Sequence, residues 1–453
     1  MIQTVNPTTG KIENIYEPLN PNEIEKRLDK AAHAFHLWRN TSLTERIELV
    51  NKLSVHLEKN KDKYAKLATT EMGRPYKDSL GEIDKSISIC LFYAKNARKF
   101  LKAEHIQTEA SKSYVQFDPL GTILGIMPWN YPFTQVFRSM IPSILAGNTF
   151  ILKHASNVPQ CSIAIENMFN ICKFPDGVMT NLLIEGKNVE LIIADDRIAA
   201  VTVTGSEKTG AAVASIAGKH LKKTVMELGG SDAFIVLSDA DIDETVKQAV
   251  KARVLNMGQS CNSPKRFILH KKIAKEFTNK FINEIKKLKI GDPFDLNVSV
   301  GPLARNDLLE KLSKQVTDST KKGARLLYGG KKLDRAGFFY EFTVVDNVVK
   351  GMPLFDEEVF GPVAVLITVS SDEDALLIAN DTHLGLSASI WTKNPARIHH
   401  FTNELHVGLV FINQAVRSDV RMPYGGVKKS GYGRELGRFG ILEFTNIKSI
   451  VIK

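Results

Sequence analysis

The chain has 453 residues, of which 43% are hydrophobic and 24% are charged. Because a single hydrophobic core stops growing at about 250–300 residues, we expect two or more packed units. The composition excludes an intrinsically disordered, fibrous or low-complexity chain and is typical of a globular enzyme.

The formal net charge of +10 is spread along the chain. Lysines are scattered over amphipathic segments such as 281–288, without a block of about five or more like charges. Solvated helix faces explain this charge better than a nucleic-acid partner, with a mild attraction for anionic substrates as the alternative. The cysteines are widely spaced and predict neither a disulfide framework nor a metal site: Cys90, Cys161, Cys172 and Cys261.

The amino-terminal residues lack the basic segment, apolar stretch and small-residue cleavage site of a secretory signal. No apolar run reaches the roughly 20 residues that are needed to cross a bilayer. We therefore expect a soluble cytoplasmic protein without a membrane partner.

In chain order, the hydrophobic pattern is first helical and then alternates between strand and helix. From 21 to about 102 the apolar residues recur at helical spacing. The next segment, 113–127, predicts a hairpin that leads into a buried strand. Short apolar runs follow, separated by segments long enough for crossover helices, at 148–153, 182–184 and 199–204. This alternation is typical of an α/β fold with a parallel, doubly wound sheet of the Rossmann type.

A second alternating region extends from Ala233 to Asn413 and predicts a second α/β unit. The tail, 447–453, has strand character, and no later segment is available to pair with it. It is expected to pair with the early hairpin or with another subunit.

Cys261, Glu227 and Asn130 are the residues whose types and settings point to chemistry. A thiol nucleophile and a carboxylate that activates water are the two reagents needed to make a thioester and then hydrolyse it. Asn130 stands between Pro128 and Pro132, which fix the backbone around it. A rigidly held amide at a strand's carboxyl end can donate a hydrogen bond to a developing oxyanion, whereas a purely structural turn is the alternative.

Gly205, Ser206 and Gly210 lie where the strand at 199–204 should pass into a helix. Backbone N–H groups at such a junction can approach a pyrophosphate. Since the spacing is not the usual G-x-G-x-x-G, a plain strand-to-helix turn is an equal alternative for these residues alone.

Taken together, seven motifs resemble those of the aldehyde dehydrogenase superfamily, in order and over essentially the whole chain. They are Pro128-Trp129-Asn130-Tyr131-Pro132, Lys153, Thr204-Gly205-Ser206, Glu227-Leu228-Gly229-Gly230, Gly258-Gln259-Ser260-Cys261, Glu358-Val359-Phe360-Gly361-Pro362 and Pro423-Tyr424-Gly425-Gly426-Val427-Lys428-Lys429-Ser430-Gly431. The resemblance implies an NAD(P)-dependent aldehyde dehydrogenase, and it makes a catalytically silent scaffold a remote alternative.

The resemblance also implies a role for each matching residue. Cys261 would attack the aldehyde to form a thiohemiacetal, whose oxyanion Asn130 and the Cys261 N–H would hold. After hydride transfer, water activated by Glu227 would hydrolyse the thioester. The cofactor contacts that the motifs imply are Lys153 at the adenine ribose, Glu358 at the nicotinamide ribose, Phe360 beside the ring, and Trp129 and Leu228 nearby. A coenzyme A-acylating enzyme is a less favoured alternative, since that branch generally lacks the base at Glu227.

Ser156 bears on the choice of nucleotide. Many NAD-dependent members carry a glutamate here, which would repel a 2′-phosphate, whereas a hydroxyl beside Lys153 can donate to it. We predict that NADP is accepted, with NAD as the alternative, because Asn157 or Lys208 can compensate in either direction.

Arg138 suggests the substrate, because it lies eight residues beyond Asn130, about two helical turns along a helix that should begin near Phe133. In succinate-semialdehyde dehydrogenases a matching arginine looks like a binder of the substrate carboxylate, and residues 120–130 and 151–155 look most similar to bacterial members of that branch. Tyr131, Ser418 and Tyr424 are the other predicted pocket residues. An enzyme for uncharged aldehydes is the alternative.

A second arginine of some of those enzymes is replaced here by Leu255, and Arg253 should point elsewhere. Arg417 or Arg421 is the candidate for the missing charge.

The resemblance implies a division into domains. Residues 1–110 and 123–230 would form the cofactor domain and 231–422 the catalytic domain. Residues 111–122 and 444–453 would form a small β bridging and oligomerisation element, with 423–443 returning to the cofactor domain. A homodimer or homotetramer is expected.

Overall fold

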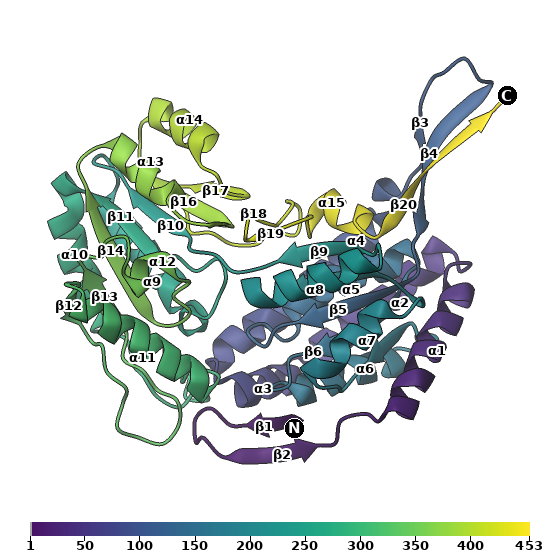
Figure 1. Cartoon of the computed structure of the whole chain (residues 1–453), viewed down its shortest axis with the longest axis horizontal. Helices are drawn as coiled ribbons and strands as arrows, with labels where there is room; N and C mark the ends of the chain where they lie inside the picture. Colours follow the sequence, from purple (N-terminus) through teal and green to yellow (C-terminus); the bar gives the residue numbers. More distant parts are fainter. Residues whose placement is uncertain (1) are drawn as a thin grey trace.

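The computed structural model describes residues 2–453, which form two α/β units side by side with a small projecting sheet (Figure 1). The sheet of the first unit has the order β19-β9-β8-β5-β6-β7 and is parallel except at β19. Its strands are β5 (Thr122–Met127), β6 (Thr149–His154), β7 (Met179–Asn181), β8 (Ile198–Thr204), β9 (Lys223–Glu227) and β19 (Gly431–Tyr432). Chain order runs outward from β5 through β6 to β7, and in the other direction from β8 to β9. The carboxyl ends of β5 and β8 therefore flank the crevice where doubly wound sheets bind ligands.

Helices cover both faces of this first sheet. One face packs on helices α2 to α6 and the other on α1, α7 and α8. The helices are α1 (Pro21–Trp38), α2 (Leu43–Lys59), α3 (Lys61–Met72), α4 (Tyr76–Phe100), α5 (Thr134–Ala146), α6 (Pro159–Ile171), α7 (Val189–Ala194), α8 (Glu207–Lys219) and α15 (Gly437–Leu442), with a 3-10 turn, η1 (Gly186–Asn188). The predicted doubly wound sheet is thus observed.

Local sequence explains where these helices begin. In α1, Pro21 occupies the first helical turn, and Asn20 and Glu23 form a capping box across it. Helix α5 begins directly after Phe133, as its sequence predicted, and all 13 of its residues are buried. Complete burial places α5 between the first sheet and α4, so side chains on its first turns face the interior of the molecule.

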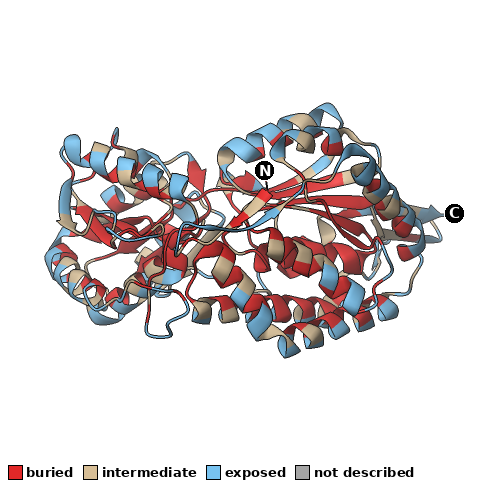
Figure 2. Cartoon of the chain, turned by 90° about the horizontal axis from the view of Figure 1, so that it is seen from below, coloured by how far each residue is buried: buried red, intermediate tan, exposed pale blue. Residues whose placement is uncertain are grey.

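The second unit contains a sheet of order β12-β13-β14-β11-β10-β16-β17, which is parallel except between β12 and β13. Its strands are β10 (Ala233–Val236), β11 (Arg266–His270), β12 (Arg325–Tyr328), β13 (Thr343–Asp346), β14 (Val363–Val369), β16 (Ser387–Trp391) and β17 (Leu409–Ile412). Its helices are α9 (Ile242–Val254), η2 (Leu255–Gly258), α10 (Lys271–Ile285), α11 (Asn306–Lys321), α12 (Pro353–Asp356), α13 (Asp372–Asn380) and α14 (Pro395–Glu404). Buried apolar strands fill the centre of both units, while exposed residues lie mainly on the outer helices and loops (Figure 2).

The projecting sheet has the order β20-β4-β3, with β3 (Glu104–His105), β4 (Lys112–Pro119) and β20 (Thr445–Ile452). The predicted hairpin between 113–121 and 122–127 is not formed, because β4 pairs with β20 and β3 while β5 joins the first sheet. Asn148 explains the separation, since its Oδ1 accepts from the N–H groups of Leu120 and Gly121 at 2.7 and 3.0 Å and turns the chain. The tail strand therefore pairs within its own chain.

Shorter strands link the units. The amino-terminal residues form the hairpin β1 (Ile2–Val5) and β2 (Ile12–Tyr16), and β15 (Leu384–Gly385) pairs with β18 (Val427–Lys428). The chain leaves the first sheet after Glu227 and returns to it at Gly431, so two crossings lie side by side. Among residues 2–453, no helix combines the length and the apolarity that a membrane crossing requires.

Candidate active site

Cys261, Glu227 and Asn130 lie together where the two units meet. Asn130 follows β5, Glu227 ends β9, and Cys261 lies between η2 and β11. The amide Nδ2 of Asn130 donates to the backbone oxygen of Gln259 at 3.1 Å, and the Nδ2 of Asn256 donates to the backbone oxygen of Asn130 at 2.9 Å. The predicted oxyanion donor is thus fastened to the loop that carries the predicted nucleophile.

A continuous set of contacts joins the nucleophile to the base. The Sγ of Cys261 lies 3.5 Å from the hydroxyl of Tyr424, whose ring lies 4.1 Å from the guanidinium carbon of Arg138. Nη2 of Arg138 lies 4.0 Å from Oε2 of Glu227. Thiol, phenol, guanidinium and carboxylate therefore follow each other in one line of contacts, which we call the polar wall.

The loop before Cys261 is held in a strained form. Asn256 and Met257 have φ values of 54° and 53°, in the left-handed region that is costly for a residue such as methionine. Complete burial of Met257 and two hydrogen bonds from Asn256 hold this turn in place. Strain of this kind is typical of functional loops that the surrounding structure over-determines.

Burial raises the pKa of the Cys261 thiol, while the hydrogen bond to Tyr424 and the positive charges of Lys265 and Arg138 lower it. Burial also raises the pKa of Glu227, helped by the nearby carboxylate of Glu435, and Arg138 opposes both effects. A general base at neutral pH needs a raised pKa of this kind. Oε1 of Glu227 has no hydrogen-bond partner among residues 2–453, so it is free to receive a proton from water.

At the start of α8, the predicted pyrophosphate site, the N–H groups of Gly205 and Gly210 are already bonded within the chain. Ser206 caps the helix, its Oγ accepting from the N–H of Thr209 at 3.2 Å, and Gly205 donates its N–H to the backbone oxygen of Glu227. Gly210 lies one turn inside the helix, where its N–H is already bonded to Ser206. A Cβ at Gly210 would come within 2.5 Å of the Leu228 side chain, so this glycine allows strand end and helix to pack closely.

Lys153, Ser156 and Asn157 surround the carboxyl end of β6. The Lys153 ammonium has no hydrogen bond or ion pair within the described residues, and partial burial lowers its pKa. Both amide atoms of Asn157 are buried and unpartnered within the same part of the chain. Buried polar groups are normally satisfied, so these orphaned groups fit a polar ligand such as the ribose or phosphate of an adenine nucleotide. Ser156 is exposed beside them.

Glu358 is linked to Cys261 through Lys265, and Phe360 follows Glu358 in sequence and contacts Trp129. Oε1 of Glu358 accepts from the N–H of Gly230 at 3.1 Å, and a Cβ at Gly229 would lie 2.6 Å from its other oxygen. The rings of Phe360 and Trp129 meet edge to face with centroids 5.7 Å apart. These side chains fit the predicted nicotinamide end, where the cofactor would supply the hydride acceptor.

Among the predicted substrate residues, Arg138 lies at the pocket but is already engaged. Only about 4% of its side chain is exposed, and it pairs with Glu435, a residue that the sequence reasoning did not single out. Tyr131 lies beneath the guanidinium of Arg74 at 4.3 Å from the ring centroid. The backbone oxygen of Ser418 accepts from the ammonium of Lys85 on α4, so Lys85 is a second residue, and the first cation, that the sequence reasoning missed here.

The other basic candidates lie elsewhere. Arg253 is fully buried and donates to the backbone oxygens of Val359 and Val363 and to the hydroxyl of Ser263, so it points away from the pocket as predicted. Arg421 is exposed and paired with Asp419, and Arg417 is exposed. Leu255 is 46% exposed.

No group of three or more histidine, cysteine, aspartate or glutamate side chains in residues 2–453 is placed to hold a metal ion. A doubly wound nucleotide sheet, a thiol and a buried carboxylate at one junction define a cysteine-dependent, pyridine-nucleotide oxidoreductase. The comparisons with known proteins agree with this class.

The aldehyde dehydrogenase family model matches residues 1–450. A probable succinate-semialdehyde dehydrogenase [NADP(+)] of Synechocystis sp. is 44% identical over 451 residues, covering 100% of this chain and 99% of that protein. The succinate semialdehyde dehydrogenase [NAD(P)+] of Escherichia coli is also 44% identical, over 99% of this chain and 97% of that protein. The crystal structure of a succinic semialdehyde dehydrogenase from Streptococcus pyogenes with NADP+ superimposes with a TM-score of 0.98 at 35% identity, covering 100% of both chains.

This chain belongs to the aldehyde dehydrogenase family. The predicted fold and enzyme class, an NAD(P)-dependent aldehyde dehydrogenase, are thereby confirmed.

Proposed function

We propose that the protein oxidises succinate semialdehyde to succinate with NADP, and accepts NAD as a second cofactor. The observation that carries this proposal is the meeting of Cys261, Asn130 and Glu227 at the unit boundary, in a chain similar over its whole length to succinate-semialdehyde dehydrogenases. The roles of the individual residues below are part of the proposal.

In the first half-reaction, the Cys261 thiolate attacks the aldehyde carbon. Tyr424, 3.5 Å from the sulfur, stabilises the thiolate by donating its phenolic hydrogen, and the Asn130 amide and the Cys261 N–H receive the oxyanion. One Nδ2 hydrogen of Asn130 already bonds to Gln259, which leaves the other for the substrate. A nucleotide held by Lys153 and Glu358 would supply the hydride acceptor, and loss of hydride from the thiohemiacetal leaves a thioester on Cys261.

In the second half-reaction, Glu227 removes a proton from water as the water attacks the thioester. Burial and Glu435 raise the pKa of Glu227. The Glu227 carboxylate is therefore a stronger base than an exposed glutamate, and its ionisation sets the low-pH limb of activity. Cys261 then leaves as thiolate and is ready for another aldehyde.

Positive charge around the segment of Ser418 favours an aldehyde that carries a carboxylate. Lys85 and the exposed Arg417 lie around the segment of Ser418, and Arg138 lies deeper in the wall. However, Arg138 already serves Glu435 and lies near Glu227, so much of its charge is offset. That offset favours an uncharged aldehyde as the second candidate substrate.

The nucleotide preference rests on the surroundings of Lys153. Its ammonium is unpaired among the described residues, and the position three residues on is a serine, which does not repel a 2′-phosphate. The orphaned amide of Asn157 offers a further donor. These groups support NADP as the preferred nucleotide.

A homo-oligomer is also part of the proposal. Strand β20 forms one edge of the projecting sheet and exposes Ile447 and Val451, at 63% and 67%. Strand β17 is an edge of the second sheet, and unpaired edges invite pairing with another chain. The four free cysteines support a reducing compartment, the cytoplasm. Sedimentation of the intact protein and of a chain ending before Ile447 tests the assembly, and equal masses would contradict it.

A panel of aldehydes assayed with NADP, NAD and coenzyme A tests the activity. We expect NADP reduction with succinate semialdehyde, independent of coenzyme A. A larger kcat/KM for butanal than for succinate semialdehyde would refute the proposed substrate, and a requirement for coenzyme A would refute hydrolysis by Glu227.

A further inference from the structure

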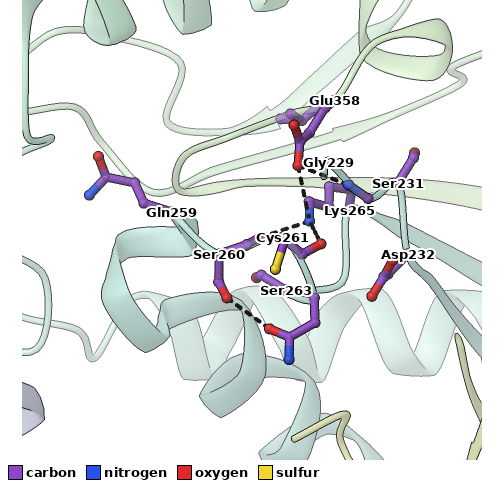
Figure 3. Close-up of polar contacts among 12 residues, drawn as sticks. Gly229, Ser231, Asp232, Gln259, Ser260, Cys261, Ser263, Lys265 and Glu358 are labelled. Atoms are coloured by element: carbon purple, nitrogen blue, oxygen red, sulfur yellow. Dashed lines mark hydrogen bonds and ion pairs between the residues drawn. The ribbon is translucent and has the colours of Figure 1, made fainter. Parts of the chain in front are cut away.

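Lys265 is a fully buried lysine four residues after Cys261, just before β11. Its Nζ donates to the backbone oxygen of Ser260 at 2.8 Å and also to that of Cys261. The same ammonium lies 3.9 Å from Oε1 of Glu358, so it lies between the nucleophile loop and the nicotinamide-end carboxylate (Figure 3). Burying an ammonium is costly, and the mechanism described so far assigns it no task.

The bond to Ser260 acts on a particular peptide group. The Ser260 carbonyl and the Cys261 N–H belong to the same peptide, and that N–H is one of the two proposed oxyanion donors. A charge on the carbonyl oxygen polarises the peptide and strengthens its N–H as a donor, because hydrogen bonds along a chain reinforce each other. The second bond, to the Cys261 carbonyl, restrains the other side of the same residue.

We propose that Lys265 is the positioning residue of the nucleophile: its ammonium fixes the two peptides that flank Cys261 and stabilises the negative charge of thiolate and oxyanion. The inference rests on the proposed function, since it takes Cys261 as the nucleophile. Lys265 touches neither substrate nor nucleotide in this role. Because Lys265 also forms an ion pair with Glu358, a group that binds this carboxylate would change the electrostatic effect of Lys265 on Cys261.

Several charged groups face this pair. Glu358 and Asp232 oppose the charge of Lys265, while Arg253 adds to it. Cys261 also faces Tyr424 and Arg138. Asp232 allows a second test with the opposite expected effect. It is buried beside Lys265, carries the opposite charge, and accepts hydrogen bonds from Ser387. Removing its charge leaves Lys265 in place with a larger net effect on the sulfur.

The test is the pH dependence of Cys261 alkylation by iodoacetamide, followed by mass spectrometry of the Cys261 peptide. This readout needs no aldehyde. We expect K265M, which keeps the length of the side chain, to raise the midpoint by about one pH unit and to slow alkylation at neutral pH about tenfold. We expect D232N to lower the midpoint, whereas K280M, on the surface of α10, should match the wild type.

An unchanged midpoint in folded K265M overturns the inference, because a merely structural lysine would alter stability alone. If K265M does not fold, D232N decides, and a midpoint that stays or rises there also overturns it. In steady state, K265M should lower kcat about tenfold at neutral pH and lose less at high pH. Failure of the proposed function is distinguishable: a C261A protein that still oxidises aldehydes refutes the function, whatever K265M does.

Discussion

Replacing Arg138 by methionine tests how the guanidinium charge of Arg138 is shared between Glu227 and Glu435. In the structure, Nη2 of Arg138 lies 4.0 Å from Glu227, and the same guanidinium pairs with Glu435. With an effective dielectric constant of about 20, unit charges at this separation interact by about 4 kcal/mol. Because Glu435 shares the guanidinium, we expect R138M to remove about half of that interaction and so to raise the pKa of Glu227.

The sign follows from the proposed role of Glu227 as a base. Only its carboxylate activates water, so a higher pKa moves the rising limb of kcat against pH to higher pH. At neutral pH, kcat should fall about tenfold for every tenfold decrease in the ionised fraction of Glu227. We expect the same fall for succinate semialdehyde and for butanal. The assay is kcat and KM from about pH 6 to 10 for both aldehydes with NADP.

The result that refutes this reasoning is an unchanged pH profile with butanal together with a higher KM for succinate semialdehyde alone. Arg138 would then serve only the substrate carboxylate. Because R138M leaves Glu435 buried without its partner, we expect a loss of about 3–5 kcal/mol of unfolding free energy. The double variant R138M/E435Q removes both charges and should recover most of that loss in denaturant unfolding.

Three further changes have defined outcomes. C261A should abolish aldehyde oxidation while leaving nucleotide binding intact, and persistent NADPH formation would contradict the mechanism. S156E should lower kcat/KM for NADP by about 10–100-fold, because a carboxylate here would repel the 2′-phosphate, with little change for NAD. Equal losses with both nucleotides would contradict the proposed nucleotide site. Burial raises the pKa of Asp232 to about 6, so the folded state holds its proton more tightly than the unfolded chain. Its stabilising contribution is complete below about pH 4 and is lost by about pH 6, so wild type should lose about 3 kcal/mol relative to D232N over this window in denaturant unfolding, and a constant difference would contradict the raised pKa.

Sequence reasoning worked best where local pattern and chemistry coincide. The alternation of apolar runs predicted both α/β units, and the start of α5 near Phe133 was predicted correctly. The motif residues Cys261, Glu227 and Asn130 do converge in the structure. The domain boundaries and the roles of individual site residues stay predictions.

The misses share a physical cause. The hairpin at 113–127 was predicted from two adjacent strand patterns, but a distant asparagine, Asn148, separates the strands into different sheets. Lys85 and Glu435 were missed because each contacts a residue that is distant in sequence. Lys85 donates to Ser418, and Glu435 pairs with Arg138. Lys265 is close to Cys261 in sequence, yet nothing in its pattern distinguishes a buried lysine from a solvated one.

The paired crossings between the two sheets have an evolutionary consequence. The proposed base, Glu227, belongs to one unit and the proposed nucleophile, Cys261, to the other, and β9 and β19 join the units beside them. In the proposed mechanism neither unit alone can carry out the reaction. Selection is therefore expected to act jointly on the residues of both units at their junction.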